Sequence, residues 1–389
     1  MQMNKSLEKY VAKTFMGMET VVADELAQLG AENISIGNRA VEFWGDKALL
    51  YKVNYCSRTI LRVLRPIASF EFKTNEQFYK NIFRIPFERY FSCDDYFCVH
   101  SIISGNTIFS NSQYTSLLAK DALCDRFREK FDARPSVDKV NPDISIDVYV
   151  SGGQCHVSLD SSGASLHFRG YKTSRHIAAL NEVLAAGLIA LSGWKADCDF
   201  IDFMCGSATL PIEAAMFATN MPAGYFRKHF GFMNWQDFDE KLWNAVKKEA
   251  NDAIREFNYK IFGSDISFRY IKEAKENVKK MGLSSIITLS IESFEDTEPE
   301  RVPAWVIINP PYGERIPLEE IENFYHSAGN ILKKKYVMCV AWVFTSNKEA
   351  MKNFGLRPSK KIKLFNAEIE CTFYRYDLYE GSKKLRIKN

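Results

Sequence analysis

The sequence predicts an α/β protein whose C-terminal part is a doubly wound, mostly parallel sheet. Short apolar segments alternate with helical patterns from residue 176 onward, and this alternation is typical of parallel strands joined by right-handed crossovers. The first strand runs into a loop of small residues, 205–209, that opens a helix. A later β-branched strand runs directly into Asn-Pro-Pro-Tyr at 309–312. Both loops fall at the carboxyl ends of strands, where open α/β sheets bind their ligands.

Each element of this part is predicted from the spacing of its apolar residues. Continuous apolar runs favour buried strands, and helical spacing favours amphipathic helices. The expected strands are 199–204, 260–264, 286–291, 305–308, 336–344 and 371–378. The expected helices are 179–191, 210–218, 243–257, 268–281 and 318–334.

The N-terminal part is predicted to contain two smaller units with both helices and strands, over 1–65 and 66–168. The first has helical patterns at 19–29 and 47–54 and strand patterns at 34–36, 40–44 and 59–64. The second has a strand at 95–103, a helix at 112–131, and two alternating segments, 144–150 and 154–159, joined by a Ser-Gly-Gly turn. The remaining chain, 169–389, forms the third unit.

Composition indicates a globular protein of a reducing compartment. The chain has 389 residues, 46% hydrophobic and 25% charged, with a net charge of +3, and no apolar run approaches membrane-spanning length. Its nine cysteines are scattered singly without a CxxC pair, which indicates neither a disulfide framework nor a zinc site. We therefore expect a cytoplasmic protein without a bound metal. The segment 356–389 is basic, with nine Lys or Arg against four acids, which suits either a solvated end or phosphate contact.

The loop after the first strand predicts a nucleotide-type cofactor. Small residues let the backbone approach a ligand, and a helix N-terminus favours an anion. Gly-x-Gly-x-x-Gly is absent, which disfavours NAD. The candidate binding residues there are Asp202, Cys205, Gly206, Ser207, Ala208 and Thr209. A β-carbon at Ala208 adds strain if φ is positive at that position, by about 1 kcal/mol or more.

Acidic residues end the next two strands. Asp265, followed by Ile266, can receive both hydroxyls of a ribose on its two oxygens, or it can cap the helix that begins at Phe268. Glu292 and Ser293 follow the third strand, and a solvated Glu292 is the alternative to a ligand contact.

The Asn-Pro-Pro-Tyr loop predicts chemistry on an exocyclic amine. The side-chain oxygen of Asn309 and the carbonyl of Pro310 can accept both protons of one –NH2 group, which directs the nitrogen lone pair at an electrophile. Pro311 stiffens the loop, since neither proline donates an N–H and both fix φ, and Tyr312 can stack on a base that has left its helix. The alternative is a proline-kinked turn with a surface tyrosine.

With the extension Gly313-Glu314-Arg315, these motifs resemble the bacterial class I S-adenosylmethionine (SAM) methyltransferases that carry a THUMP domain and modify guanine N2 in 23S ribosomal RNA. The resemblance implies a ferredoxin-like unit over 1–65, a THUMP RNA-binding domain over 66–168 and a Rossmann-like methyltransferase domain over 169–389, closed by a hairpin near 362–366 and 370–379. It implies SAM as cofactor, with its ammonium on Asp202, its adenine amine near Glu292, and Asn309 beside it. The family usually has Gly where this chain has Ala208, so we expect function to be retained and cofactor affinity to be the property that this difference affects.

RNA is the expected partner. The linker 165–172 interleaves cations with aromatic rings, which suits phosphate contact and base stacking or an ordinary basic linker. The candidate RNA-binding residues are His167, Arg169, Tyr171, Lys172 and Arg315. The aromatic segment 225–235 is expected either to pack as a lid or to meet nucleotides. A monomer is favoured. The alternatives are a transfer-RNA guanine-N2 methyltransferase, an adenine-N6 methyltransferase, and an inactive RNA-binding assembly factor.

Overall fold

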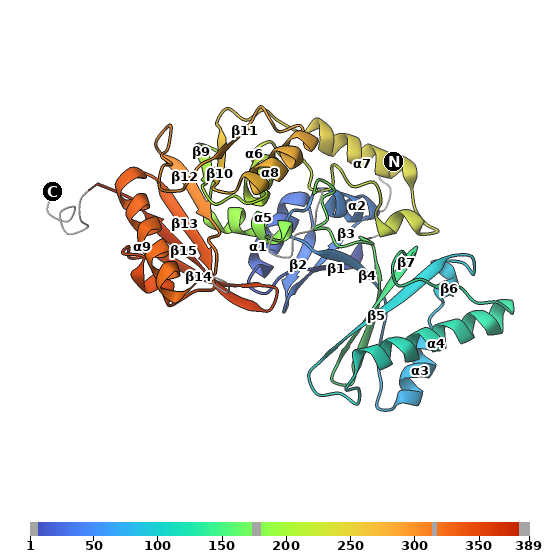
Figure 1. Ribbon diagram of the computed structural model, residues 1–389. Coiled ribbons are helices and arrows are strands. Elements are labelled where there is room, and N and C mark those ends of the chain that lie inside the picture. The colour runs from blue at the N-terminus through green and yellow to red at the C-terminus, as the bar shows by residue number, and fades with distance from the viewer. Residues whose placement is uncertain (1–6, 173–179, 313–316, 381–389) are drawn as a thin grey trace. The chain divides into compact units, whose positions relative to one another are not determined.

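The computed structural model describes residues 7–172, 180–312 and 317–380 (Figure 1). The chain divides into two compact units, and each unit is built from segments that are not contiguous in the sequence. Unit one contains the chain up to Thr14, then Val22–Phe168 and Arg227–Ala250; unit two contains Phe15–Val21, Arg169–Phe226 and the chain from Asn251 onward. Among the described residues, no helix combines the length and the apolar character needed to cross a membrane.

Within the described residues, the strands of unit one form an eight-stranded sheet in the order β2-β3-β1-β4-β8-β7-β5-β6. The first half is ferredoxin-like. Its elements are β1 (Glu8–Lys13), α1 (Glu19–Leu29), β2 (Glu32–Ile36), β3 (Ala40–Gly45), α2 (Lys47–Cys56) and β4 (Arg62–Glu71). The predicted helices are present, but β1 was not predicted, because its charged ends hide a short alternation in which Tyr10 and Ala12 are buried.

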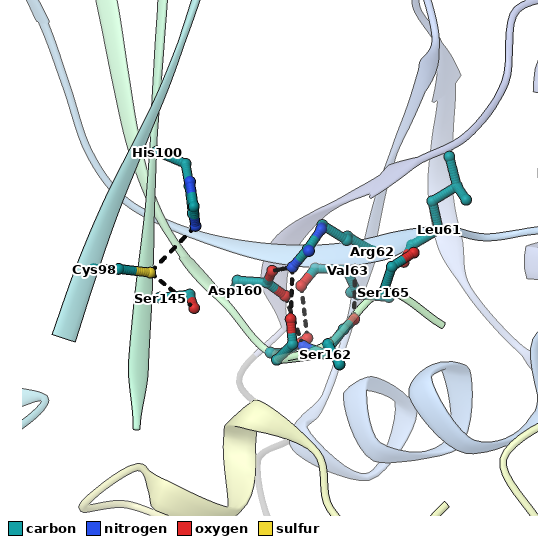
Figure 2. Close-up of polar contacts among 12 residues, drawn as sticks. Leu61, Arg62, Val63, Cys98, His100, Ser145, Asp160, Ser162 and Ser165 are labelled. Carbon is teal, nitrogen blue, oxygen red and sulfur yellow. Dashed lines mark hydrogen bonds and ion pairs between the residues drawn. The ribbon is translucent and has the colours of Figure 1, made fainter. Parts of the chain in front are cut away.

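The second half of unit one continues the same sheet. Its elements are α3 (Asn75–Phe83), η1 (Phe87–Arg89), β5 (Tyr96–Ser104), α4 (Ser112–Phe131), β6 (Ser136–Val137), β7 (Ile144–Ser151) and β8 (Gln154–Asp160). Strand β4 pairs with β1 on one side and β8 on the other, so the boundary predicted at residue 65 falls inside a strand. Figure 2 shows the polar contacts at this junction, where Arg62 is ion-paired with Asp160 and the Val63 N–H donates to Ser162 Oγ over 2.9 Å.

The later part of the aromatic segment 225–235 packs in the core of unit one, where Phe230 and Phe232 are fully buried; the segment was expected to form a lid or to meet nucleotides, and these two rings do neither. It contains η2 (Gly231–Asn234), and α7 (Glu240–Asp252) follows it. The ring of Phe232 stacks on Tyr51 with centroids 4.4 Å apart, and Trp243 meets Tyr55 edge-on at 5.4 Å. The guanidinium of Arg227 donates to four linker carbonyls, those of Ser162, Ala164, Ser165 and Phe168.

Unit two is the predicted doubly wound fold. In the part of the chain that the structure describes, its sheet has seven strands in the order β11-β10-β9-β12-β13-β15-β14. The strands are β9 (Asp199–Asp202), β10 (Ile261–Asp265), β11 (Ile287–Ile291), β12 (Ala304–Ile308), β13 (Val340–Thr345), β14 (Lys360–Asn366) and β15 (Ile369–Asp377). The remaining elements are α5 (Glu182–Ser192), α6 (Thr209–Ala218), α8 (Phe268–Lys280), α9 (Leu318–Lys335) and η3 (Ala350–Asn353). All neighbours are parallel up to β13, and β15 is antiparallel to both β13 and β14.

Candidate active site

Four predicted side chains lie at the carboxyl ends of four neighbouring parallel strands. Asp202 ends β9, Asp265 ends β10, Glu292 follows β11 and Asn309 follows β12. Because β11, β10, β9 and β12 are consecutive and parallel in the sheet, these ends share one edge. The fold therefore brings together residues that are more than a hundred positions apart in the sequence.

The loop between β9 and α6 is a tight turn with two left-handed residues. Gly206 has φ +53° and Ala208 has φ +67°, and the Ala208 N–H donates to the Cys205 carbonyl over 2.8 Å. The side chain of Ala208 is buried. The expectation of a strained β-carbon at this position is confirmed. The Ser207 carbonyl accepts from Asn277 Nδ2 over 3.2 Å, so α8 also holds the loop.

Asp265 ties this loop to the neighbouring strand. Its Oδ2 accepts from the Gly206 N–H over 3.0 Å and its Oδ1 from the Ser267 N–H over 2.8 Å. Ser267, not Asp265, caps α8, since its hydroxyl accepts from the Tyr270 N–H. Each carboxylate oxygen has further acceptor capacity, so a pair of hydroxyls can still bind there.

Asp202 is a buried acid beside a second acid. Burial raises its pKa to about 8; the N–H of Met204, 3.1 Å from Oδ1, opposes the rise, and the charge of Asp265 adds to it. A carboxyl group in this setting gains most from a cationic ligand, which would favour its charged form. The ammonium of an amino acid fits that requirement.

Apolar side chains flank the ends of β10 and β11. Ile266 is 77% exposed, and Phe268 and Ile291 are also exposed. Exposed apolar surface between Asp265 and Glu292 suits the flat face of a base. Glu292 accepts from the Ser290 hydroxyl over 3.2 Å, and Ser293 Oγ accepts from the Glu295 N–H over 3.4 Å. The set of donors and acceptors along this edge therefore fits an adenosine linked to an amino acid.

The Asn-Pro-Pro-Tyr loop is held from several sides. The Tyr312 hydroxyl donates to Asn309 Oδ1 over 3.0 Å, and the Tyr312 ring packs against the apolar core. Burial raises the pKa of that hydroxyl. The Pro311 carbonyl accepts from the Tyr325 hydroxyl over 3.2 Å and the Tyr312 carbonyl from Asn347 Nδ2 over 3.0 Å. Arg315 lies outside the described residues.

The prediction that Arg169 and Tyr171 contact RNA is corrected by their burial. Arg169 is 1% exposed and Tyr171 is fully buried. The guanidinium of Arg169 pairs with the buried carboxylate of Glu213 on α6, with Nε 3.2 Å from Oε1. Lys172 pairs with Glu182 over 3.0 Å. An interleaved cationic and aromatic pattern suits a buried ion pair as well as an RNA surface, and the sequence did not reveal the partner acids.

His167, the remaining described residue of the linker prediction, is half-buried, with Nδ1 2.8 Å from Ser165 Oγ.

A hollow in unit one is a further candidate site that the sequence did not reveal. Its volume is about 180 Å³. His100 lies there with Nε2 3.2 Å from Cys98 Sγ (Figure 2), and burial raises the pKa of that thiol. The lining residues are Cys98, Val99, His100, Gln113, Ser116, Leu117, Lys120, Val137 and Lys139.

The fold and the residues at this sheet edge define a class I methyltransferase, the class that uses SAM as methyl donor. Residues 169–375 match the family model described as "RMKL-like, methyltransferase domain". Residues 9–64 match the RlmL ferredoxin-like domain and 72–160 the THUMP domain. The chain belongs to the RMKL-like methyltransferase family.

Relatives match over nearly the whole chain. The Synechocystis sp. protein named "Putative RNA methyltransferase slr0064" is 36% identical over 372 residues, which cover 95% of this chain and 97% of that protein. The crystal structure titled "SMU.472, a putative methyltransferase complexed with SAH" has a TM-score of 0.87 at 27% identity, and the match covers 98% of this chain and 100% of that chain. A Listeria monocytogenes structure titled "a predicted N6-adenine-specific DNA methylase" has a TM-score of 0.85 at 28% identity, covering 95% and 96%.

Proposed function

We propose that this protein transfers a methyl group from SAM to the exocyclic N2 amine of a guanine in 23S ribosomal RNA. The observation that carries the proposal is the Asn309–Tyr312 loop at the end of β12, on the same sheet edge as Asp202, the 205–209 loop and Asp265. An amine acceptor and a cofactor site on one edge suit direct transfer between two bound groups.

Two oxygens of the loop grip the amine. Asn309 Oδ1 accepts one proton and the Pro310 carbonyl accepts the other. The next two carbonyls along the chain already have donors, from Tyr325 and Asn347, and no described residue donates to the carbonyl of Pro310. Holding both protons aims the nitrogen lone pair at the methyl group that SAM supplies. Tyr312 leaves Asn309 and stacks on the base.

The remaining predicted residues hold the cofactor. Asp202 binds the ammonium, and the backbone of Cys205, Gly206, Ser207, Ala208 and Thr209 faces the carboxylate at the start of α6. Asp265 accepts from the ribose, Ile266 packs on the adenine, and Glu292 and Ser293 lie beside its amine. Asn309 closes the site from the side of β12.

The RNA contacts are assigned to unit one. A THUMP match over 72–160 and a relative named as an RNA methyltransferase support an RNA substrate. Because Arg169 and Tyr171 are buried, we place phosphate contact at Lys120 and Lys139, which line the hollow beside His100. Of the linker residues, half-buried His167 remains a proposed contact, as does Lys172 should it release Glu182.

A second candidate function is methylation of adenine N6. The loop accepts any exocyclic amine, and the Listeria neighbour carries that title. Guanine is favoured by the Gly313-Glu314-Arg315 extension. The localisation proposed for either function is cytoplasmic, and the protomer is proposed to act as a monomer.

The test is transfer of radiolabelled methyl from SAM to purified 23S, 16S and transfer RNA, each transcribed without modification. Nucleoside mass spectrometry then identifies the product. N2-methylguanosine in 23S RNA alone supports the proposal. N6-methyladenosine, label in transfer RNA alone, or tight RNA binding with no label in any RNA would each replace it with a named alternative.

A further inference from the structure

We propose that Tyr325 and Asn347 are positioning residues that fix the amine-gripping loop through its backbone carbonyls; this inference rests on the function proposed above. Tyr325 lies on α9 and Asn347 follows β13. Neither residue belongs to the Asn-Pro-Pro-Tyr motif. Their side chains reach the carbonyls of Pro311 and Tyr312, the two positions next to Pro310.

The directions of these hydrogen bonds follow from the chemistry of each group. The Pro311 carbonyl can only accept, so the phenol of Tyr325 donates its single proton to it over 3.2 Å. The contact of 2.6 Å between Tyr325 Oη and Thr345 Oγ1 then takes its proton from Thr345. The Thr345 oxygen in turn accepts from the Asn347 N–H over 3.0 Å. A directed chain therefore runs from the Asn347 backbone through Thr345 and Tyr325 to the loop.

Asn347 uses both ends of its amide. Nδ2 donates to the Tyr312 carbonyl over 3.0 Å, and Oδ1 accepts from the Ala350 N–H over 2.8 Å. Because Oδ1 has an N–H donor, the orientation of the amide is determined: the NH2 group faces the loop. Asn347 thus contributes to the loop twice, directly and through Thr345.

The loop needs this external support because of its own sequence. Pro310 and Pro311 have no N–H, so the loop cannot tie itself to the sheet through these two residues. Tyr325 is buried and burial raises its pKa to about 12, so it stays a neutral donor at any physiological pH. Fixing the carbonyls of Pro311 and Tyr312 fixes the peptide planes that follow Pro310, and with them the direction of the Pro310 carbonyl.

Loss of the hydrogen bonds from Tyr325 and Asn347 should affect methyl transfer and not cofactor binding. A misplacement of the acceptor oxygens by about 1 Å can lower turnover by about 100-fold. Apart from Asn309, the proposed cofactor residues lie on the loops after β9, β10 and β11, away from these hydrogen bonds, so SAM affinity should depend little on Tyr325 and Asn347. A loss of turnover with unchanged SAM binding separates positioning from a general structural role.

The test compares Tyr325→Phe with Tyr336→Phe in the full-length protein. Tyr336 follows the same helix, is equally buried, and its hydroxyl donates to Thr297 Oγ1 over 2.8 Å, so the control removes one buried hydrogen bond away from the loop, whereas Tyr325→Phe removes two. With both variants assayed well below their Tm, we expect Tyr325→Phe to lower kcat about tenfold or more with the Kd for SAM unchanged, and Tyr336→Phe to leave kcat within about twofold. Equal kcat values for the two variants would overturn the inference.

Asn347→Asp provides an independent arm. The aspartate keeps the acceptor for Ala350 but places an acceptor oxygen, in place of the donor, against the Tyr312 carbonyl, so kcat should fall while the Kd for SAM is unchanged. Wild-type kcat would overturn the role of Asn347. Asn309→Ala distinguishes this inference from the proposed function: if Asn309→Ala retains turnover, the proposed chemistry fails; if it is inactive while Tyr325→Phe and Asn347→Asp behave as wild type, only the positioning role fails.

Discussion

The hydroxyl of Tyr312 donates a hydrogen bond to Oδ1 of Asn309 across 3.0 Å. That oxygen is the one proposed to grip the target amine, so the ligand-free protein satisfies its own acceptor. Asn366 Nδ2 and Cys371 Sγ lie 3.5 and 3.8 Å from the same hydroxyl. A base entering the site has to replace this contact before the ring of Tyr312 can stack on it.

Tyr312→Phe should therefore keep turnover, in contrast to Tyr312→Ala. The phenylalanine retains the ring for stacking and removes the competing hydrogen bond, which is worth about 1 kcal/mol. We expect the KM for RNA to fall by up to about fivefold, whereas Tyr312→Ala should lower kcat/KM by at least tenfold. Steady-state methylation assays with both variants check this. A Phe variant as inactive as the Ala variant would show that the hydroxyl itself has a role in transfer.

Ala208→Gly should have an effect opposite to that of Ala215→Gly. Ala208 has φ +67°, where glycine relieves strain of about 1–2 kcal/mol and loses a buried methyl worth about 0.8 kcal/mol. We expect an unchanged or slightly higher Tm and, because the methyl group is buried in the core and does not face the ligand, a Kd for SAM that changes little.

Ala215 lies inside α6 and is equally buried, so glycine there loses the methyl and adds about 1 kcal/mol of helix cost. Its Tm should fall by several degrees. Thermal unfolding and calorimetric titration with SAM measure both effects. A larger loss of Tm in Ala208→Gly than in Ala215→Gly would contradict the strain argument.

SAM affinity should rise with pH up to about 8. The pKa of Asp202 in the ligand-free protein is raised to about 8, so below that value the carboxyl must lose a proton before it can hold an ammonium. The dissociation constant should fall by up to about tenfold per pH unit between pH 6 and 8. Asp202→Asn should bind SAM more weakly, with this pH dependence removed. Calorimetric titrations at several pH values measure the Kd for SAM. A Kd that does not change between pH 6 and 8 in the wild type would exclude Asp202 as the ammonium site.

The same pKa has a consequence for stability. An unfolded aspartate titrates near pH 4, well below the folded value, so the folded state binds the proton more tightly. The contribution of Asp202 to stability is therefore greatest below pH 4 and is lost as pH rises toward 8. The difference in Tm between Asp202→Asn and the wild type should grow in favour of the variant over that interval.

Lys120→Glu and Lys139→Glu together should weaken RNA binding without changing SAM binding. If both lysines contact phosphates, the double variant should bind RNA at least tenfold more weakly and with a smaller dependence on salt. Lys241→Glu, an exposed change elsewhere in unit one, is the control. Filter binding at several salt concentrations measures the slope. An unchanged slope in the double variant would move the RNA surface away from this hollow.

The sequence predicted the positions of residues at the sheet edge better than the environment of the linker residues. Asp202, Asp265 and Asn309 could be placed at one sheet edge because each lies at the end of a strongly apolar strand, and the carboxyl ends of parallel strands share one edge regardless of the intervening loops. Arg169 and Tyr171 were wrongly predicted to contact RNA. The burial of Arg169 depends on its ion pair with Glu213, which lies on another element. A local pattern of cations and rings does not show whether a distant acid is available.

The prediction of domain boundaries was limited for the same reason, because it too depends on contacts between distant segments. Apolar periodicity located most helices and strands, yet it placed 227–250 with the methyltransferase domain because that segment lies between two of its elements. The structure places it with unit one, where Phe232 and Trp243 complete a cluster around Tyr51 and Tyr55. Pairing between segments that are far apart in the chain is set by shape and available surface, which a single sequence does not contain.

The position of Arg227–Ala250 in unit one, after a long segment of unit two in the sequence, affects the order in which the protein folds during translation. As the nascent chain leaves the ribosome from its N-terminus, the aromatic cluster of unit one lacks Phe230, Phe232 and Trp243 until more than half of the protein has been translated. The RNA-binding half therefore finishes folding only after the first strand and helix of the catalytic half have been synthesised, and a gene cut at residue 168 would yield a product with an unfilled hydrophobic face.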